Sequence, residues 1–147
     1  MSGAQVWNRN CGLFDGRLLT FDIRRLGCEN MSGYKDLAIY QRAYENALIM
    51  HKLTNTLPKH ETYELSSQMR RAAISIPLNI AEGYGRKIHQ NDFKNFLVVA
   101  LGSCNEVNVL LDMISDLSYI ANDEYVKLKD SYDHLGRQIT KFIQAMN

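Results

Sequence analysis

A regular row of polar side chains runs along one predicted helix near the middle of the chain. At 100° per residue, these residues fall in one narrow stripe beside a stripe of Met, Ala and Ile. The row consists of Gln68, Arg71, Ser75, Asn79, Glu82 and Arg86. It can bind a polar ligand or a nucleic acid, or it can form a buried hydrogen-bond and ion-pair network, in which an unpaired member would be costly. We interpret Gln68, Arg71, Ser75, Asn79 and Glu82 as a structural polar network of this second kind.

A second group of residues has the chemistry to contact phosphates. Its members are Arg42, Lys52, Arg70, Arg86 and Lys87. Lys and Arg neutralise backbone phosphates, and nearby aromatic rings can stack on unpaired bases. The rings in question are Tyr40, Tyr44, Tyr63 and Tyr84. The same basic residues also fit an ordinary solvated helix face. Two alternatives therefore stay open, a nucleic-acid-associated adaptor and a structural or protein-binding oligomer.

Catalytic and metal-binding patterns are weak in this chain. His60-Glu61-x-x-Glu64 lacks the second histidine of a zinc protease motif, and no Glu-x-x-His pair of a di-iron bundle occurs. Gly83-Tyr84-Gly85 follows a helix and is too short for a dinucleotide-binding loop. We expect His51 to be a core or boundary residue with a hydrogen-bond partner, because no second ligand lies at metal-binding spacing. The expectation is a protein that is not an enzyme and has no metal or cofactor.

The cysteines and the hydropathy indicate a cellular compartment. Cys11, Cys28 and Cys104 are three in number, so at least one is unpaired, as in a reducing cytosol. Cys104 falls on an apolar helix face, where we expect a buried thiol. No continuous apolar run is long enough to span a membrane, and the N-terminus does not resemble a secretory signal. We therefore expect a cytoplasmic protein without membrane contacts.

Hydrophobic periodicity predicts four helices that can position these side chains. We expect them at about residues 36–56, from residue 61 through the polar row, at 91–121, and from 122 or 123 to the end. Short connections make neighbouring helices antiparallel. The predicted fold class is all-α, an antiparallel up-and-down four-helix bundle over residues 34–147.

Prolines and glycines mark the expected helix ends. Pro58 ends the first helix, because proline disfavours helical geometry in the preceding residue. Pro77 predicts a kink in the second helix, and we expect Gly83 and Gly85 to end it in a left-handed cap. Gly102, in the third helix, is expected to allow close backbone approach.

Two predicted helices have more apolar surface than one neighbouring layer can cover. The first has an apolar face around Tyr44 and Leu48 and a nearly opposite one around Ala43 and Met50. The third is apolar on every side between Phe96 and Leu101. Such helices are typical of subunit interfaces, so we expect an oligomer.

Residues 1–33 are predicted to be an N-terminal arm outside the bundle. They contain scattered glycines and polar residues without a sustained period, which is typical of disorder or a loosely docked segment. Met31-Ser32-Gly33 repeats Met1-Ser2-Gly3. This repeat suggests that translation starts at Met31, or that the preceding residues add little to the fold.

The formal charge differs between the two halves of the predicted bundle. Residues 34–89 hold eight Lys or Arg against five Asp or Glu, whereas residues 90–147 hold five against eight. This division predicts a basic side on the first two helices and an acidic side on the last two. A net charge near zero argues against a strong, indiscriminate DNA coat.

Three signatures, in order along the chain, resemble the bacterial 23S rRNA intervening-sequence protein family. They are Arg70-Arg71-Ala72, Asn79-Ile80-Ala81-Glu82-Gly83 and Gly102-Ser103-x-x-Glu106. The resemblance covers residues 34–147. It implies a small up-and-down four-helix bundle that assembles into ring-like homo-oligomers, with pentamers expected.

The family is also similar to the accessory protein of diversity-generating retroelements, a barrel that binds nucleic acid and a reverse transcriptase. The resemblance therefore implies structured RNA or DNA, and a nucleic-acid-processing protein, as partners of this chain. It implies no enzymatic activity. The function that we expect from the sequence is that of a non-enzymatic, homo-oligomeric adaptor.

Overall fold

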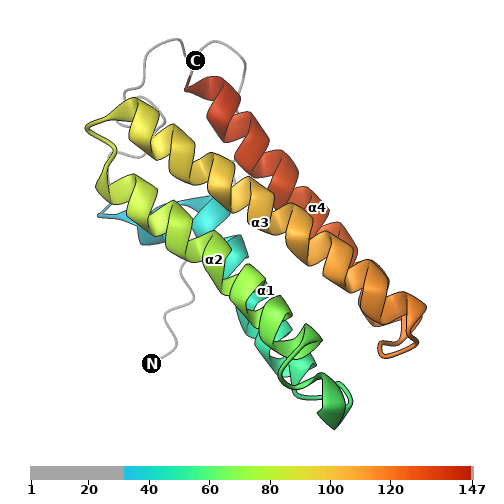
Figure 1. Cartoon of the computed structure of the whole chain (residues 1–147). Coiled ribbons are helices and arrows are strands. Elements are labelled where there is room, and N and C mark those ends of the chain that lie inside the picture. The colour runs from blue at the N-terminus through green and yellow to red at the C-terminus, as the bar shows by residue number, and fades with distance from the viewer. Residues whose placement is uncertain (1–31, 147) are drawn as a thin grey trace, which may run out of the picture.

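Four long antiparallel helices make up the part of the chain that the computed structural model describes, residues 32–146 (Figure 1). The helices are α1 (Ala38–Thr54), α2 (Leu65–Gly85), α3 (Gln90–Asp116) and α4 (Asn122–Ala145). Short 3-10 helices, η3 (Tyr34–Asp36) and η4 (Lys59–Glu61), precede α1 and α2. The predicted all-α bundle is confirmed. The predicted N-terminal arm lies almost wholly outside the described residues.

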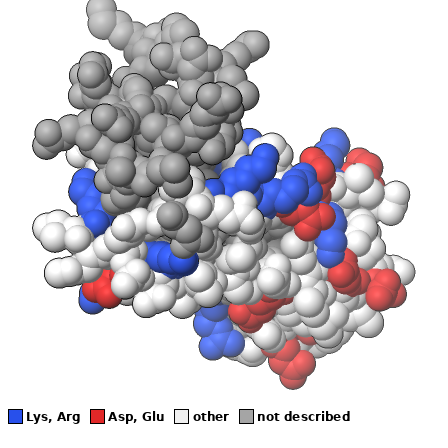
Figure 2. Space-filling view, turned by 90° about the horizontal axis from the view of Figure 1, so that it is seen from above, with Lys and Arg blue, Asp and Glu red and all other residues white. Residues whose placement is uncertain are grey.

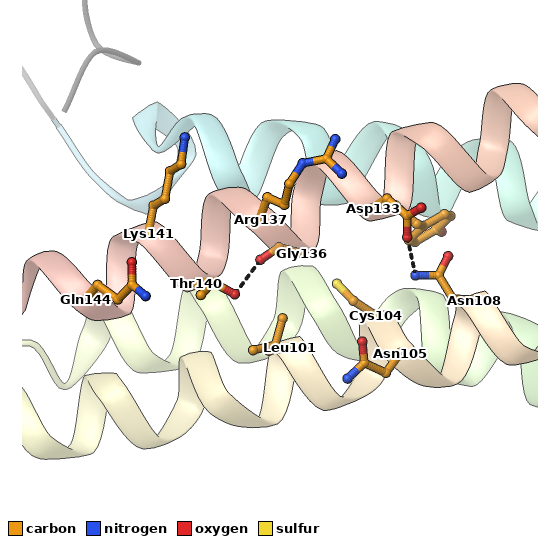
Figure 3. A pocket seen from close by; sticks show the side chains of 11 residues that line it. Leu101, Cys104, Asn105, Asn108, Asp133, Gly136, Arg137, Thr140, Lys141 and Gln144 are labelled. Carbon is orange, nitrogen blue, oxygen red and sulfur yellow. Dashed lines mark hydrogen bonds between the residues drawn. The ribbon is translucent and has the colours of Figure 1, made fainter.

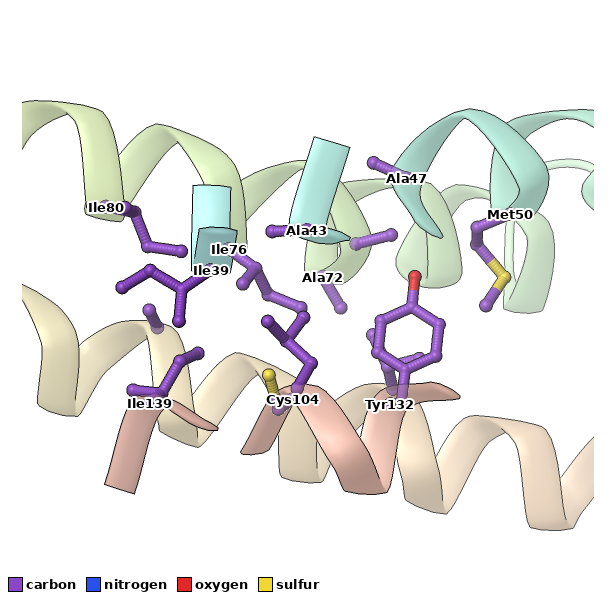
Figure 4. Packing of buried hydrophobic residues seen from close by; sticks show 14 of the residues in the cluster. Ile39, Ala43, Ala47, Met50, Ala72, Ile76, Ile80, Cys104, Tyr132 and Ile139 are labelled. Atoms are coloured by element: carbon purple, nitrogen blue, oxygen red, sulfur yellow. The ribbon is translucent and has the colours of Figure 1, made fainter. Parts of the chain in front are cut away.

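The core lies along the bundle axis and contains residues from all four helices. In α3 the buried positions follow the predicted steps of three and four, from Phe93 through Leu97 and Cys104 to Ile114. Figure 4 shows Tyr132 of α4 directed between the helices toward Ala47 and Met50 of α1. Aliphatic side chains from α1 and α2 complete this core. Because each helix buries one apolar face, the periodicity of the sequence could locate most of the core residues.

The contacts between neighbouring helices are unequal. The α2–α3 pair makes the most extensive contact, and α1–α2 and α3–α4 follow. The α1–α4 pair makes the least. The bundle therefore consists of two helical hairpins that are joined firmly along α2 and α3 and more loosely along α1 and α4.

The structure corrects the predicted end of the second helix. Gly83 and Gly85 both lie inside α2, and neither has the left-handed backbone conformation that the predicted cap requires. Gly83 instead allows close packing, because a Cβ there would lie 2.7 Å from Phe96 Cβ and 2.8 Å from a ring carbon of Phe93. Pro77 lies inside the helix, as predicted.

Two further predictions on single residues are wrong. Gly102 mediates no close approach within residues 32–146, since it is exposed on α3 and an added Cβ would meet no atom of another element within 4 Å. His51 is not a core residue, because it is exposed at the edge between α1 and α2. The apolar spacing of the first helix placed His51 near the core, but its tertiary position leaves it exposed.

Helix bounds differ modestly from those predicted. Glu61 belongs to η4, so α2 begins four residues later. Helix α3 ends at Asp116, and Ser118 then has a left-handed conformation (φ 59°) that turns the chain toward α4. Within residues 32–146, α3 is also the one helix long and apolar enough to cross a membrane. The buried seam of α3 accounts for part of that composition, and exposed apolar residues such as Val98, Val109 and Met113 account for the rest.

Candidate functional site

The polar row of α2 faces α3, and its centre forms a connected hydrogen-bond cluster. The hydroxyl oxygens of Ser75 and Ser103 lie 2.8 Å apart. Asn79 Nδ2 donates to the carbonyl oxygen of Ser75 at 2.7 Å and to its hydroxyl oxygen at 3.0 Å. This cluster joins α2 to α3 beside Pro77. Because Pro77 lacks an N–H, the carbonyl oxygen of Ala73 loses its helical hydrogen-bond donor. Asn79 does not replace this donor, because its Nδ2 donates to the carbonyl oxygen of Ser75 instead.

The outer members of the row do not join this cluster. Gln68 Nε2 donates to Glu106 Oε1 on α3 at 3.3 Å, and Glu82 pairs with Arg86 at 3.2 Å on an exposed helix face. Arg71 is exposed, and within residues 32–146 it makes no hydrogen bond or ion pair. The row is therefore three separate contacts and one solvated arginine.

Three of the five predicted phosphate-binding residues already have partners within the chain. Arg70 donates to Thr54 Oγ1 and to the carbonyl of Thr62, so it ties the end of α1 to the connection before α2. The Arg86 guanidinium lies 5.2 Å from the centroid of the Phe96 ring. Lys87 Nζ lies 3.8 Å from the centroid of the Tyr84 ring. These contacts stabilise the fold and also hold the two cations at the α2–α3 turn.

The remaining two predicted residues lie far apart on α1. Lys52 is exposed in the last turn, whereas Arg42 lies in the second turn and is partly buried. Arg42 is close enough to His134 of α4 to influence its titration. The five residues therefore do not form one surface, and Lys52 and Arg70 lie toward the end of the bundle opposite to the other three.

Sequence reasoning missed two cations of α4 that lie close to Arg42. Burial and then the charges of Arg42 and Arg137, with a smaller contribution from Lys141, lower the pKa of His134, while Asp130 opposes this shift. Arg42, Arg86, Lys87, Arg137 and Lys141 thus come from α1, the α2–α3 turn and the last turns of α4. We call these five residues the basic end of the bundle.

Within α3 and α4, charge also differs along the bundle axis, in addition to the predicted division between the first and last pairs of helices. Residues 104–133, at the α3–α4 connection, hold seven Asp or Glu against two Lys. Residues 134–146 hold Arg137 and Lys141 and no carboxylate. Figure 2 shows the molecule from above, turned by 90° from Figure 1. Lys and Arg side chains cross the middle of this face, and Asp and Glu side chains lie mainly to one side. Dividing α4 at Asp133 would have revealed this polarity from the sequence.

A groove of about 560 Å³ runs between α3 and α4, next to the basic end (Figure 3). Its lining combines apolar, amide and charged side chains. The lining residues are Leu101, Cys104, Asn105, Asn108, Tyr132, Asp133, Gly136, Arg137, Thr140, Lys141 and Gln144. We call it the α3–α4 groove. Asn108 Nδ2 donates to Asp133 Oδ1 at 2.9 Å across it.

A second, largely apolar groove of about 250 Å³ lies between α1 and α2. Tyr34, Tyr40 and Tyr44 form a ladder along it, with ring centroids 4.9 and 6.0 Å apart. Leu48, Ile74 and Leu78 complete its exposed wall, with Pro77 and Ala81 at its floor. We call it the α1–α2 groove.

Groups with obvious catalytic reactivity are scarce among the described residues. Between residues 32 and 146, no three His, Cys, Asp or Glu side chains are grouped so as to hold a metal ion. Cys104 is buried, as predicted, and burial raises the pKa of its thiol to about 12. The thiol is therefore neutral and a poor nucleophile near neutral pH.

Comparison with known proteins agrees with the sequence signatures. The family described as 23S rRNA-intervening sequence protein matches residues 35–141. A solved structure of a protein with unknown function from the S23 ribosomal protein family of Bacteroides thetaiotaomicron is 23% identical, with a TM-score of 0.67 over 72% of this chain and 95% of that chain. This likeness concerns the fold alone, and no curated protein matches the chain. By its family match, the chain belongs to the 23S rRNA-intervening sequence protein family.

Proposed function

We propose that this protein is a non-enzymatic, homo-oligomeric adaptor of the bacterial cytoplasm that holds structured RNA or DNA at its basic end. The main support for this proposal is that three separate segments bring five cations to one end of the bundle, namely Arg42, Arg86, Lys87, Arg137 and Lys141. Phosphate contacts supply much of the affinity of nucleic-acid-binding proteins.

The surroundings of these cations support phosphate binding. The nearest carboxylate of α4, Asp133, lies one turn before Arg137 and accepts a hydrogen bond from Asn108, and neither Arg137 nor Lys141 makes an ion pair within the described chain. The acidic residues of α3 and α4 near their connection would repel a polyanion. The polarity therefore favours one orientation of the bundle on a nucleic acid.

Two exposed apolar surfaces support the homo-oligomer. The α1–α2 groove exposes Leu78 to 62%. The outer face of α3 exposes Val98, Val109 and Met113. Because the surfaces differ and lie on different helices, copies that pair them associate head to tail, which closes into a ring when the rotation permits. The pentamer implied by the resemblance is one such ring.

Fluorescence anisotropy tests nucleic-acid binding. We expect the full chain to bind a hairpin RNA or a duplex DNA with an affinity that falls with salt. For duplex DNA, the logarithmic slope should become shallower by about 0.9 for each phosphate that Arg137→Ala or Lys141→Ala no longer neutralises. Lys127→Ala is the matched control, because Lys127 is an exposed lysine of α4 outside the basic end. An absence of binding at low salt would refute the adaptor.

Analytical ultracentrifugation tests the oligomer. Leu78→Asp puts a charge into the α1–α2 groove and should shift the protein toward smaller species. Val126→Asp is the control, because Val126 is similarly exposed (54%) but lies outside both apolar surfaces. If Leu78→Asp and the wild-type protein sediment identically, this groove is not the interface.

A structural or protein-binding oligomer without a nucleic-acid role is the second candidate. It is favoured by the contacts of Arg70, Arg86 and Lys87 inside the chain, which explain these residues without any ligand. It predicts that Arg71→Ala or Glu82→Ala breaks the oligomer in the absence of nucleic acid. The adaptor predicts instead that both variants keep the oligomer intact.

A further inference from the structure

We infer that the α3–α4 groove holds one unpaired nucleotide of an RNA or DNA strand whose phosphates lie on the basic end. This inference rests on the proposed function and deepens it, because it assigns a site and a strand conformation. Three features of the groove carry it: an open apolar floor, a rim of amide groups and a pair of cations at one edge.

The floor can accept a flat ring. It is formed by Leu101 and Cys104 of α3 and by Gly136 of α4. Gly136 has no side chain, so the two helices leave space there, and a Cβ at this position would come within 3.7 Å of Leu101. The Cys104 thiol is uncharged near neutral pH, so the floor contains no charge. A base presents an apolar face of this kind to a protein surface.

The rim can hydrogen-bond the edges of a base. Asn105 and Gln144 are exposed amides on opposite sides of the groove, and each offers a donor and an acceptor. Asn108 donates a hydrogen bond from Nδ2 to Asp133, while its buried Oδ1 accepts no hydrogen bond from any described residue. Figure 3 shows these amides along the groove, with Thr140 already bonded to the carbonyl of Gly136.

Two cations at the edge of the groove can contact the phosphate next to a bound base. Arg137 and Lys141 are one helical turn apart on α4 and both line the groove. Asp133, the one carboxylate of the lining, lies one turn from Arg137 and two turns from Lys141, and Asn108 Nδ2 donates to one of its oxygens. A phosphodiester at Lys141 therefore lies about two helical turns from this negative charge.

The groove discriminates against paired bases. Its volume of about 560 Å³ lies within the range of clefts that bury small organic ligands. A base inside a duplex has both faces stacked and its edge paired, so it can enter only after it is flipped out, at a cost of a few kcal/mol. Loops and ends of structured RNA supply such bases without that cost.

Filling the floor without changing any charge tests the inference. Gly136→Leu should weaken binding of a single-stranded oligouridine by about tenfold or more in fluorescence anisotropy. Its affinity for a fully paired duplex should stay unchanged, because the cations are intact. Gly136→Ala is the matched control, because its small side chain makes an ordinary contact with Leu101. Circular dichroism and sedimentation verify that both variants fold and assemble like the wild-type protein.

A second variant keeps the test decisive if Gly136→Leu does not fold. Asn105→Ala combined with Gln144→Ala removes two exposed amides and should reduce differences in affinity among oligouridine, oligoadenosine and oligocytidine. Unchanged single-strand binding in Gly136→Leu, with weaker binding in Arg137→Ala, would overturn the inference and leave the adaptor standing. No binding of any nucleic acid by the wild-type protein would overturn both.

Discussion

The α2–α3 seam and the α1–α4 seam join the same two helical hairpins, yet they differ in how their polar groups are satisfied. At the α2–α3 seam, Ser75, Asn79 and Ser103 bond to one another, and Gly83 lets the helices approach closely. At the α1–α4 seam, four buried polar atoms have no partner among the described residues. They are Arg42 Nε, Asn46 Nδ2, Tyr132 OH and Gln138 Oε1.

This difference teaches where the fold is specified and where it is tolerant. A buried polar group without a partner costs about 1–3 kcal/mol, whereas a paired one is close to neutral or stabilising. The α2–α3 seam therefore supplies rigidity. At the α1–α4 seam, the polar atoms left unpartnered within residues 32–146 lower the stability of the fold, and a substitution that removes them can restore it. One hydrogen bond joins the helices there, from Ser131 to Asn46.

The largest contrast should come from truncating a buried isoleucine of α2 and an exposed isoleucine of α1. Ile76 of α2 is fully buried, so Ile76→Ala should destabilise the protein by about 2–5 kcal/mol. Ile49 lies on α1 one turn after Asn46 and is 46% exposed, so Ile49→Ala should cost about 0.5 kcal/mol or less. Urea unfolding followed by circular dichroism measures both. Equal losses would contradict the difference in burial between these two positions.

A pair of glycine substitutions should separate close packing from helix propensity. Gly83→Ala should destabilise by about 1–3 kcal/mol, because the new methyl group collides with Phe96 Cβ and the Phe93 ring. Gly102→Ala should stabilise by about 0.5–1 kcal/mol, because its site is open and alanine favours the helix. Thermal unfolding compares them. Stabilisation by both substitutions would show that the α2–α3 seam has room to spare.

Removing one hydroxyl from each seam should act in opposite directions. Ser103→Ala leaves Ser75 without its partner across the seam and should cost about 0.5–1.5 kcal/mol. Tyr132→Phe removes a buried hydroxyl that has no partner in the described chain, so it should be neutral or stabilising by up to about 1 kcal/mol. Denaturant midpoints decide between them. A large loss of stability in Tyr132→Phe would reveal an unseen partner of this hydroxyl, such as water.

The smallest effect should be a pH dependence at the α1–α4 seam. Burial and the charges of Arg42 and Arg137 hold the pKa of His134 below its ordinary 6.5. The unfolded chain therefore binds this proton more readily, and stability falls as the pH drops through that value. His134→Gln should lose less stability than the wild-type protein between about pH 7.5 and about pH 5.5.

Asp112 provides the internal control for that measurement. A hydrogen bond from Lys129 is the main cause that lowers the pKa of Asp112 below its ordinary 3.8. Its stabilisation is present above that ordinary value and is lost only as the pH falls toward the lower folded value. Identical pH dependence of wild type and His134→Gln in the higher window would contradict the expected role of His134.

Periodicity predicted the four helices and most of the core, because one buried face per helix leaves a clear pattern in the sequence. It could not rank the two apolar faces of α1. Tyr44 and Leu48 resemble core residues in the sequence, yet they line the exposed α1–α2 groove. Nothing local distinguishes a face covered within the chain from a face left open to solvent.

The residues of the candidate site were harder to predict than the helices. Arg70 was expected to contact phosphate, but Thr54 and Thr62 bind it, and these partners depend on the path of the α1–α2 connection. Arg137 and Lys141 were overlooked because charge was summed over each half of the chain. Their position next to Arg42 depends on the antiparallel pairing of α1 with α4, which the sequence predicted but which the charge count did not use.

An even number of antiparallel helices returns the chain to the end of the bundle where it started (Figure 1). Residues 32 and 146 therefore both lie at the same end as Arg86 and Lys87, and Gln90 Nε2 holds the carbonyl of Met146 there. A fluorophore or affinity tag fused directly after residue 146 would crowd this surface during binding assays. The α3–α4 connection at Ser118 is the better attachment point, because it places the label a full bundle length away.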